Sequence, residues 1–400
     1  MTNKTLIIHL ITRLEPGSPA RNVIDSAIYQ AKHRKVLLAA GSCAGALELP
    51  EIIQYQELPD LKSGVAPLSD LKAYFELKQL FLRLEPAVIH THTAKAGFLG
   101  RLAARAHNRS VKNGKNKTLV IHTPHGHLLY GHFSPFKAFI FKLIERLAAR
   151  WTDCFIALTR GELEESVAAG LGAREKWSVI HSGVRFAPME FDRASIRKEM
   201  GFAAEDTVLG VVARLEHVKG IEYFIQAAKL MSDTAKDRKL RFMIVGSGGL
   251  ETELRALATQ LGLGEKIIFT GFQKDIFRYL CSMDLYIQPS LNEAMGRTVL
   301  EAQYARLPVI ASKVCGLPDT VKDGATGILV PPADPGAIAA AAQTLLDNET
   351  KRRAMGEAAR RWVLQKDYTG YTQFSVEAMN ISLKNFYNKA LGKVAGRSGD

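Results

Sequence analysis

The residues best suited to chemistry lie in NEAMGRTVLEA, residues 292–302, which holds two glutamates. Glu293 and Glu301 have seven residues between them, and the second falls in a helix predicted to begin near residue 297. On one helix their backbones would lie about 12 Å apart, which suits the paired carboxylates of a glycosidase poorly. The spacing favours acids that hold hydroxyl groups at two ends of an elongated ligand. A solvent-facing acid beside an acid stabilised by the helix dipole is the structural alternative.

Two cations follow the strand predicted from TVLGVVAR, residues 207–214. Arg214 ends the strand, Lys219 and Gly220 occupy a short loop, and a helix is predicted to begin near residue 221. Fixed positive charge beside a helix N-terminus, where backbone N–H groups are unpaired, makes a site for phosphate. Two unrelated surface cations are the alternative that these residues leave open.

Glycine-containing turns follow two further predicted strands. In FMIVGSGGLETEL, Gly246 and Gly248 precede a helix, but Glu251 stands where a GxGxxG fingerprint needs its third glycine. A tight turn that lets the backbone approach a ligand is therefore favoured over a nicotinamide site. Gly271 and Phe272 end the strand in IIFTGF, where a base could rest against main-chain groups or where an ordinary turn could lie.

Histidines gather in IHTHTAKAG and IHTPHGHLLYGHF of the first half. The HExxH spacing is absent and no acid is close in sequence to orient the rings, so no metal site is predicted. We expect a strand-end histidine to donate to a phosphate or a sugar hydroxyl, and some of the others to be structural. The six are His90, His92, His122, His125, His127 and His132.

Short apolar runs alternate with amphipathic stretches, which predicts parallel sheets covered by helices on both faces. Two such series predict two doubly wound α/β domains that bind a ligand in a cleft, with the break in residues 181–195. The strands are predicted at 6–11, 36–41, 87–93, 119–125, 154–159, 207–214, 240–246, 266–271, 285–290, 308–312 and 326–332. The helices are predicted at 20–33, 68–84, 95–108, 135–151, 220–231, 250–262, 297–306 and 335–348.

Composition excludes several classes of protein. The 400 residues fit two domains, and no apolar run reaches the roughly 18 residues of a membrane span. The apolar stretch Leu6–Ile11 predicts a buried strand and not a signal peptide. The four cysteines form no metal or disulfide pattern, so we expect a cytoplasmic protein with reduced thiols.

The net charge of +13 is unevenly distributed, because residues 86–144 contain no carboxylate. Such a stretch attracts polyanions, although a merely solvated basic surface would look the same. Nucleic acid is not expected, since no recognised nucleic-acid motif accompanies the charge. In residues 135–151, an apolar stripe that includes Phe136, Phe139 and Leu143 runs beside Lys137 and Lys142. This helix could lie on an anionic membrane surface, or its stripe could face the core.

The order of these motifs resembles glycosyltransferase family 4. The likeness rests on the strand-end Arg and Lys, the GxG turn, the Gly-Phe turn, E-x7-E entering a helix and GLPDTVKDGATGILVPPAD, and it is strongest in residues 208–335. It implies the GT-B fold, two Rossmann-like domains facing a cleft, with the final helix crossing back to the first domain. We therefore expect an N-terminal, acceptor-side domain of residues 1–185 plus 375–400, and a nucleotide-sugar domain of residues 186–374.

The resemblance also implies roles for individual residues. Arg214 and Lys219 would neutralise the leaving diphosphate, Glu301 would hold the ribose and Glu293 the donor sugar. His125 of HTPHG matches a histidine beside that sugar. The remaining donor-binding positions are Gly17, Gly246, Gly248, Gly271, Phe272, Ala294, Met295 and Gly296. This chain departs from the family pattern at Ser18 and Pro19, and in the linker at Ser182 and Arg185.

From this likeness we expect a retaining, metal-independent glycosyltransferase of the hexosyl or N-acetylhexosaminyl type, with no cofactor. It would move a sugar from a nucleotide-diphosphate sugar, weighted towards a UDP-sugar, to a hydroxyl of a saccharide or lipid-linked acceptor in polysaccharide assembly. It could act at the inner face of a membrane. A nucleotide-sugar epimerase and a non-catalytic basic lipid-binding protein are the alternatives.

Overall fold

The computed structural model describes residues 5–15, 17–43, 49–111, 117–126, 134–186, 191–235 and 238–396. The chain forms two compact units. It passes from the first unit to the second after Gly183 and returns to the first after Phe374. Each unit is a parallel sheet covered by helices on both faces, which confirms the predicted fold of two Rossmann-like domains.

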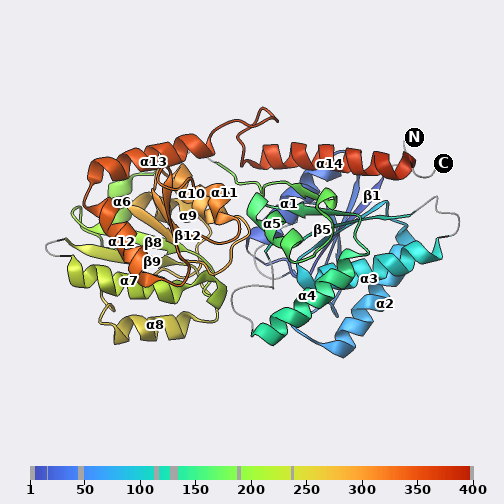
Figure 1. Cartoon of the computed structure of the whole chain (residues 1–400), viewed down its shortest axis with the longest axis horizontal. Coiled ribbons are helices and arrows are strands. Elements are labelled where there is room, and N and C mark those ends of the chain that lie inside the picture. Colours follow the sequence, from blue (N-terminus) through green and yellow to red (C-terminus); the bar gives the residue numbers. More distant parts are fainter. Residues whose placement is uncertain are drawn as a thin grey trace. The chain divides into compact units, whose positions relative to one another are not determined.

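In the described residues of the first unit, seven parallel strands form one sheet in the order β3-β2-β1-β4-β5-β6-β7. Figure 1 labels β1 and β5 of this sheet. The order reverses between β1 and β4, so the loops after these two strands diverge at the point where doubly wound sheets bind ligands. The strands are β1 Leu6–Ile11, β2 Lys35–Ala40, β3 Gln54–Glu57, β4 Val88–His92, β5 Leu119–Thr123, β6 Cys154–Ala157 and β7 Trp177–Val179.

Alternate residues of β1 supply the cores on the two faces of this sheet. Ile8 and Leu10 join the cluster beneath α2 and α3, whereas Ile7 joins the cluster beneath α14. In α14, Met379, Leu383 and Tyr387 cover that second face. The helices of this unit are α1 Ser18–Ala31, α2 Pro67–Leu84, α3 Ala94–Ser110, α4 Pro135–Ala149, α5 Arg160–Ala168 and α14 Val376–Gly396.

Where the structure describes the second unit, six parallel strands form a sheet in the order β10-β9-β8-β11-β12-β13. Its order reverses between β8 and β11, which places the predicted cationic loop and the two-glutamate segment at one switch point. The strands are β8 Thr207–Val212, β9 Leu240–Val245, β10 Ile267–Phe269, β11 Leu285–Gln288, β12 Val309–Ser312 and β13 Gly327–Val330. The helices are α6 Arg193–Glu199, α7 Ile221–Thr234, α8 Glu251–Gln260, α9 Ile276–Ser282, α10 Arg297–Tyr304, α11 Leu317–Thr320, α12 Pro335–Leu346 and α13 Glu349–Val363.

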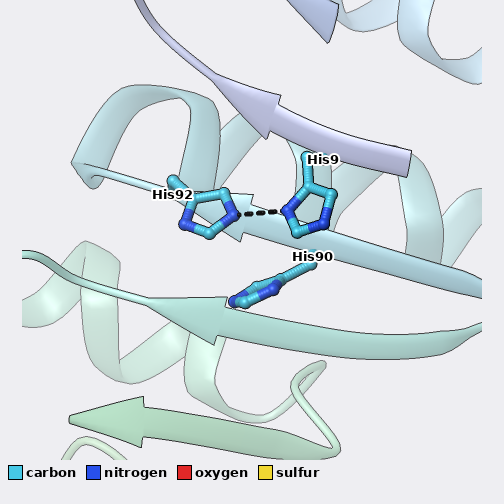
Figure 2. Close-up of side chains that lie close together, drawn as sticks. All are labelled: His9, His90 and His92. Atoms are coloured by element: carbon cyan, nitrogen blue, oxygen red, sulfur yellow. Dashed lines mark hydrogen bonds between the residues drawn. The ribbon is translucent and has the colours of Figure 1, made fainter. Parts of the chain in front are cut away.

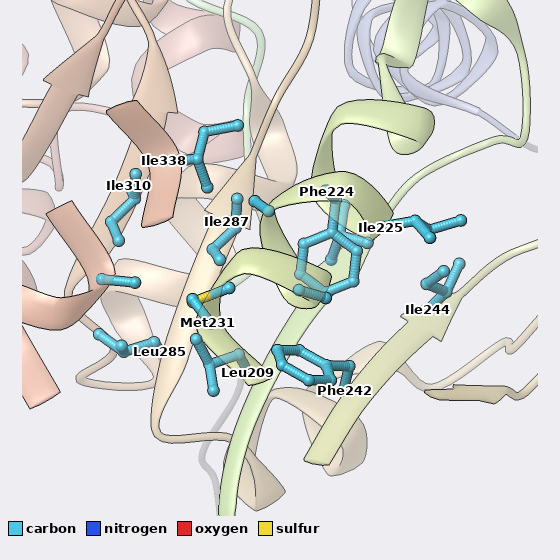
Figure 3. Packing of buried hydrophobic residues seen from close by; sticks show 14 of the residues in the cluster. Leu209, Phe224, Ile225, Met231, Phe242, Ile244, Leu285, Ile287, Ile310 and Ile338 are labelled. Atoms are coloured by element: carbon cyan, nitrogen blue, oxygen red, sulfur yellow. The ribbon is translucent and has the colours of Figure 1, made fainter. Parts of the chain in front are cut away.

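The larger core of the second unit lies beneath α7 and α12. Phe224 and Ile225 of α7 pack against Leu209 and Phe242 of the sheet, and Ile338 comes from α12 (Figure 3). The 3–4 spacing of apolar residues in α7 explains this contact, because it puts them on one helical face. Burying these side chains fixes the ends of β8 and β11, from which the site loops emerge.

All eleven predicted strands are present. The sequence reading missed β3 and β7, because QYQE and WSV are short and lack an apolar run. It also missed α5, α6, α9, α11 and α13.

The helix predicted at 135–151 is α4, and its apolar stripe does not face the core. Phe136, Phe139 and Leu143 are 72%, 63% and 59% exposed, and Ile140 and Leu147 are also exposed. Only Ala148 and Ala149 are buried among the α4 side chains. The core-facing alternative is therefore wrong for most of this stripe.

Part of the positive charge of the carboxylate-free stretch is paired with acids from outside it in the structure. Lys95 pairs with Asp70, which lies before the stretch, and the fully buried Arg101 pairs with Glu145, which lies after it. Arg105 stacks over the ring of Trp151. Acids distant in sequence thus neutralise part of the predicted basic field, and Lys112 and Lys115 lie outside the described residues.

Candidate functional site

The centre of the candidate site is an ion pair between Lys219 and Glu293, whose Nζ and Oε2 atoms lie 2.5 Å apart. Their side chains are only 18% and 14% exposed. The loops that carry them are held together, since the N–H of Leu291 donates to the carbonyl of Val218 over 2.9 Å. Gly220 ends the first loop with φ of 62°, and a Cβ there would lie 2.2 Å from the carbonyl oxygen of Pro289. Only glycine fits this crossing of two loops.

A buried chain of polar side chains runs from the sheet to Glu293. The Tyr286 hydroxyl donates to Gln288 Oε1 at 2.6 Å, and Gln288 Nε2 donates to Ser290 Oγ at 2.8 Å. Ser290 Oγ donates to Glu293 Oε2 at 3.4 Å. Thr298 Oγ1 also donates to Gln288 Oε1, at 3.2 Å. The Glu293 carboxylate is thus held by a cation on one side and by a hydroxyl anchored in the sheet on the other.

The two glutamates of E-x7-E lie in different local settings. Glu293 lies in the loop before α10, which begins after Gly296 at φ 75°, and Glu301 is a buried residue of the helix at 6% exposure. Both carboxylates act electrostatically on Tyr286, whose pKa is raised mainly by burial. Ala294 and Met295 are buried in the turn between them. The prediction that Glu293 precedes the helix is confirmed.

Arg214 does not share the Lys219 ion pair. Its guanidinium pairs with Glu216 at 2.6 Å, and both side chains are nearly half exposed. An exposed pair of this kind contributes little to stability, so Arg214 can exchange Glu216 for an anionic ligand at small cost. The convergence of Arg214 and Lys219 on one phosphate stays a prediction.

The glycine turn after β9 packs against the loop after β8. A Cβ at Gly246 would lie 1.9 Å from the carbonyl oxygen of Ala213, and one at Gly248 would lie 2.5 Å from that of Leu215. The structure thus explains both glycines by contact with protein backbone. An open pocket of about 390 Å³ adjoins this contact. It is lined by Leu215, Glu216, His217, Val218, Gly249 and Leu250.

The turn predicted to receive a base borders the same glycines. The N–H of Gly246 donates to the carbonyl of Gly271 over 2.9 Å, so the turns after β9 and β10 are joined. Phe272 is 56% exposed beside this junction. A large exposed ring next to main-chain groups is compatible with stacking on a base, which stays a prediction.

In the first unit, His125 follows β5 at the carboxyl edge of the sheet. Its φ of 59° is unusual for a residue with a side chain, and such strain concentrates at functional sites. The next N–H, that of Gly126, donates to Glu162 Oε1 at 2.8 Å, and Leu158 N–H donates to Glu162 Oε2 at 2.6 Å. Burial raises the pKa of the Glu162 carboxyl to about 7, against the lowering effect of these two bonds.

His9, His90 and His92 form a buried cluster on β1 and β4 (Figure 2). One ring nitrogen of each lies within 4.8 Å of the others, which is a spacing that could surround a metal ion. His9 was not predicted to join this group. The register places it opposite His90, and the sequence alone does not show that register. His127 and His132 lie outside the described residues.

The first unit also contains the predicted donor-binding residue Gly17 and the linker residue Ser182, which departs from the family pattern. Gly17 is the N-cap of α1, with Pro19 at the start of the helix. The linker residue Ser182 accepts a hydrogen bond from Asn22 Nδ2 at 2.9 Å and is fully buried. A serine at this linker position thus has a packing role within the unit.

Sequence reasoning missed Tyr286, Gln288, Ser290 and Glu162. The first three could have been predicted, because they alternate along LYIQPS and therefore lie on one face of an apolar strand. Polar residues repeating at period two in a buried strand indicate an internal network. Nothing close in sequence links Glu162 to the loop that it holds.

Comparison with known proteins identifies the chain. Residues 33–183 match the family described as Glycosyl transferase 4-like domain, and residues 192–362 match Glycosyl transferases group 1. An Escherichia coli UDP-Gal:alpha-D-GlcNAc-diphosphoundecaprenol alpha-1,3-galactosyltransferase is 30% identical over 277 residues, which cover 68% of this chain and 70% of that protein. The chain is a GT-B glycosyltransferase of the GT4-like family.

Other relatives cover more of this glycosyltransferase. The putative glycosyltransferase EpsD of Bacillus subtilis is 29% identical over 331 residues, covering 80% of this chain and 83% of that one. The crystal structure of Anabaena Alr3699/HepE in complex with UDP-glucose superposes with a TM-score of 0.77 at 21% identity. That match covers 96% of this chain and 100% of the other, and it supports the fold.

Proposed function

We infer that this glycosyltransferase moves a sugar from a UDP-sugar to an acceptor hydroxyl with retention of anomeric configuration. The observation that carries the proposal is the Lys219–Glu293 pair at the switch point of the second sheet, beside the glycine turns. In GT-B relatives, UDP-glucose is bound by Anabaena Alr3699/HepE. A cation for the diphosphate and acids for the hydroxyls are the groups that such a donor needs.

The pair also suggests how donor binding begins. Lys219 and Glu293 neutralise each other in the free protein, which keeps both side chains in place. The incoming diphosphate takes Lys219 as its partner, and the sugar hydroxyls then donate to the released Glu293 carboxylate. Glu301, in α10, holds the ribose hydroxyls. Each new interaction replaces one that the free site already had, so little reorganisation is required.

Charge stabilisation then drives transfer. Negative charge grows on the leaving diphosphate, where Lys219, Arg214 and the N-terminus of α7 stabilise it. No metal or other cofactor takes part in this proposal, because protein cations supply the charge. We expect His125 to contact the transferred sugar, as the family resemblance implies, and the acceptor hydroxyl to enter from the face that the diphosphate leaves.

We assign a membrane-bound, lipid-linked saccharide as the acceptor. Five large apolar side chains of α4 are exposed, and Lys137 is exposed among them. An apolar face rimmed by cations fits an anionic bilayer. Among the described helices, none has the length and hydropathy to span a membrane. The E. coli relative's name specifies a diphosphoundecaprenol-linked acceptor, which fits glycan assembly at the inner face of a membrane.

The donor-site proposal is tested by binding and by variants. In a thermal-shift screen of UDP-, GDP- and ADP-sugars, we expect a UDP-sugar to stabilise the wild type most. Lys219→Ala should lower kcat for UDP release by about 100-fold or more, since loss of one group that stabilises developing charge has that scale. Glu301→Gln should raise the KM for the donor. Lys229→Ala is the matched control, because Lys229 forms an exposed 2.5 Å pair with Asp233 on α7.

Three results would contradict this proposal. One is that no UDP-sugar shifts the melting temperature, and another is that Lys219→Ala turns over like Lys229→Ala. The third is free UDP with an altered free sugar and no need of an acceptor, which would identify an epimerase.

A further inference from the structure

A line of four side chains connects the interior of the first unit to His125. Gln30 Oε1 lies 3.1 Å from His9 Nε2, His9 Nδ1 lies 3.0 Å from His92 Nε2, and His92 Nδ1 lies 3.0 Å from His125 Nε2. We call these four residues the histidine relay. They come from α1, β1, β4 and the loop after β5. The first three are buried, at 5%, 0% and 1% exposure.

Burial keeps the rings of the relay neutral. It lowers the pKa of His9 to about 4 and that of His125 to about 3, and it holds the pKa of His92 well below its usual range. A neutral imidazole has one N–H donor and one lone pair. Three such rings in a line can therefore bond throughout only if all donors point the same way.

Gln30 sets that direction. The atom of Gln30 that faces His9 Nε2 is the amide oxygen Oε1, at 3.1 Å. An amide oxygen can only accept a hydrogen bond, so it accepts from His9 Nε2–H. It follows that His92 donates through Nε2–H to His9 Nδ1, and His125 donates through Nε2–H to His92 Nδ1.

A metal ion suits the same histidines less well. In the described structure, both nitrogens of His9 and of His92 have relay partners. His90, the third member of the buried cluster, bonds Tyr387 Oη at 2.6 Å and Thr123 Oγ1 at 2.8 Å. A metal would displace several of these bonds, and no carboxylate bonds to any of these rings in the part of the chain that the structure describes.

We propose that Gln30, His9 and His92 are positioning residues that hold His125 as the Nε2–H tautomer, with the Nδ1 lone pair available to a substrate hydroxyl. This inference rests on the proposed function for the place of His125 beside the sugar. Beyond that function, it specifies that His125 accepts a hydrogen bond from substrate and does not donate one. Gln30, His9 and His92 act by setting the tautomer of His125 and do not contact the substrate themselves.

The tautomer can be measured without substrate. In long-range ¹H–¹⁵N spectra of ¹⁵N-histidine-labelled protein, we expect His125 Nδ1 in the wild type to be unprotonated and Nε2 to be protonated. Gln30→Met removes the terminal acceptor at similar volume and should give a mixture of His125 tautomers. His9→Phe is a second variant that breaks the line. His122→Gln is the matched control, because His122 is equally buried but bonds Thr91 Oγ1.

Hydrolysis of the UDP-sugar selected by the thermal-shift screen provides the second measurement. Gln30→Met should lower kcat about tenfold with KM within about twofold, and His122→Gln should leave kcat near wild type. A His125 Nδ1–H tautomer in the wild type, or a tautomer unchanged in both relay variants, would overturn the relay. So would stoichiometric Zn²⁺ binding with displaced resonances of His9, His90 and His92.

The two proposals fail in different ways. If the tautomer shifts as expected but kcat does not change, the positioning role is wrong while the donor site stands. If the wild type neither binds nor hydrolyses any UDP-sugar, the proposed function fails. The spectra of the free protein would then decide the tautomer by themselves.

Discussion

Gln288 is the residue that connects the interior of the second sheet to the candidate site. It is 1% exposed, accepts from Tyr286 and donates to Ser290, which in turn bonds Glu293. A buried amide that satisfies its partners on both sides fixes their orientation. Glu293 is therefore positioned by residues that need no contact with a ligand.

Replacing Gln288 should affect both stability and turnover. Gln288→Leu leaves the Tyr286 and Ser290 hydroxyls without this partner, at a cost of about 1–3 kcal/mol in the free energy of unfolding. We also expect kcat for UDP release to fall by about tenfold, because Ser290, the second partner of Glu293, is no longer held by Gln288. Urea unfolding and steady-state kinetics measure the two effects.

Gln303→Leu is the matched control for that change. Gln303 is also fully buried, but its Nε2 donates to the Thr320 carbonyl at 2.8 Å, away from Glu293. The Gln303→Leu variant should have a lower free energy of unfolding than the wild type and a kcat near the wild-type value. Equal kcat values in the two variants would show that Gln288 has only a structural role.

Some residues of the candidate sites could be predicted from the sequence, and others could not. Glu293, Glu301 and Lys219 were found because they follow apolar runs that mark strands, and the structure joins Lys219 to Glu293. The pairing of Arg214 with Glu216 could not be predicted from the sequence. The two residues are close in sequence, but only side-chain geometry determines whether their charged groups meet. The histidine relay depends on strand register, which places His9 opposite His90 and within bonding distance of His92, two residues further along β4. No local sequence pattern encodes this register.

Among the elements, α4 differs most from its sequence expectation. Amphipathic periodicity predicts a helix correctly but does not say what its apolar face contacts. Here that face is exposed, and no core formed by the described residues covers its large side chains. The strands β3 and β7 were missed for a different reason, because they are short edge strands without an apolar run.

Membrane binding through α4 is directly testable. Phe139→Ser with Leu143→Ser should lower pelleting with phosphatidylglycerol-containing vesicles by about tenfold or more, because two large apolar contacts are lost. High salt should weaken wild-type binding, since screening reduces attraction of the cations to lipid. Leu230→Ser, which alters a 44% exposed leucine on α7 of the second unit, should bind as wild type. Absence of wild-type pelleting would contradict the assignment.

At the scale of the whole molecule, buried titratable groups set how stability depends on pH. Burial lowers the pKa of His9, His90, His92, His122 and His125 in the fold, while the unfolded chain has histidines near pKa 6.5. Below about pH 6.5 the unfolded state therefore binds more protons, and stability falls as pH falls. Glu162 has the opposite sign, because its pKa is raised from 4.5 to about 7.

We therefore expect the free energy of unfolding to decrease from pH 7 to pH 5, since several histidines outweigh one carboxyl. The stability contributed by Glu162 is fully present below about pH 4.5 and is lost as pH rises to about 7, so it opposes this decrease. Glu162→Gln should make the acid-side loss steeper. Urea unfolding at pH 7.5, 6.5 and 5.5 gives the free energy of unfolding of the wild type and of the Glu162→Gln variant. Greater wild-type stability at pH 5.5 than at pH 7.5 would show that the histidine cluster is charged or open in the fold.

The path of α14 determines what a shortened chain would lose. The chain leaves the second unit after Phe374, whose carbonyl accepts from Val184 N–H over 2.7 Å, and α14 then packs on Ile7 and Ile121 of the first unit. A stop codon near residue 375 would therefore leave the second unit's own residues in place and uncover the core of the first unit. Deletions or tags at this end should be interpreted as perturbations of the first unit, even though residues 184–374, which precede them in the sequence, belong to the second.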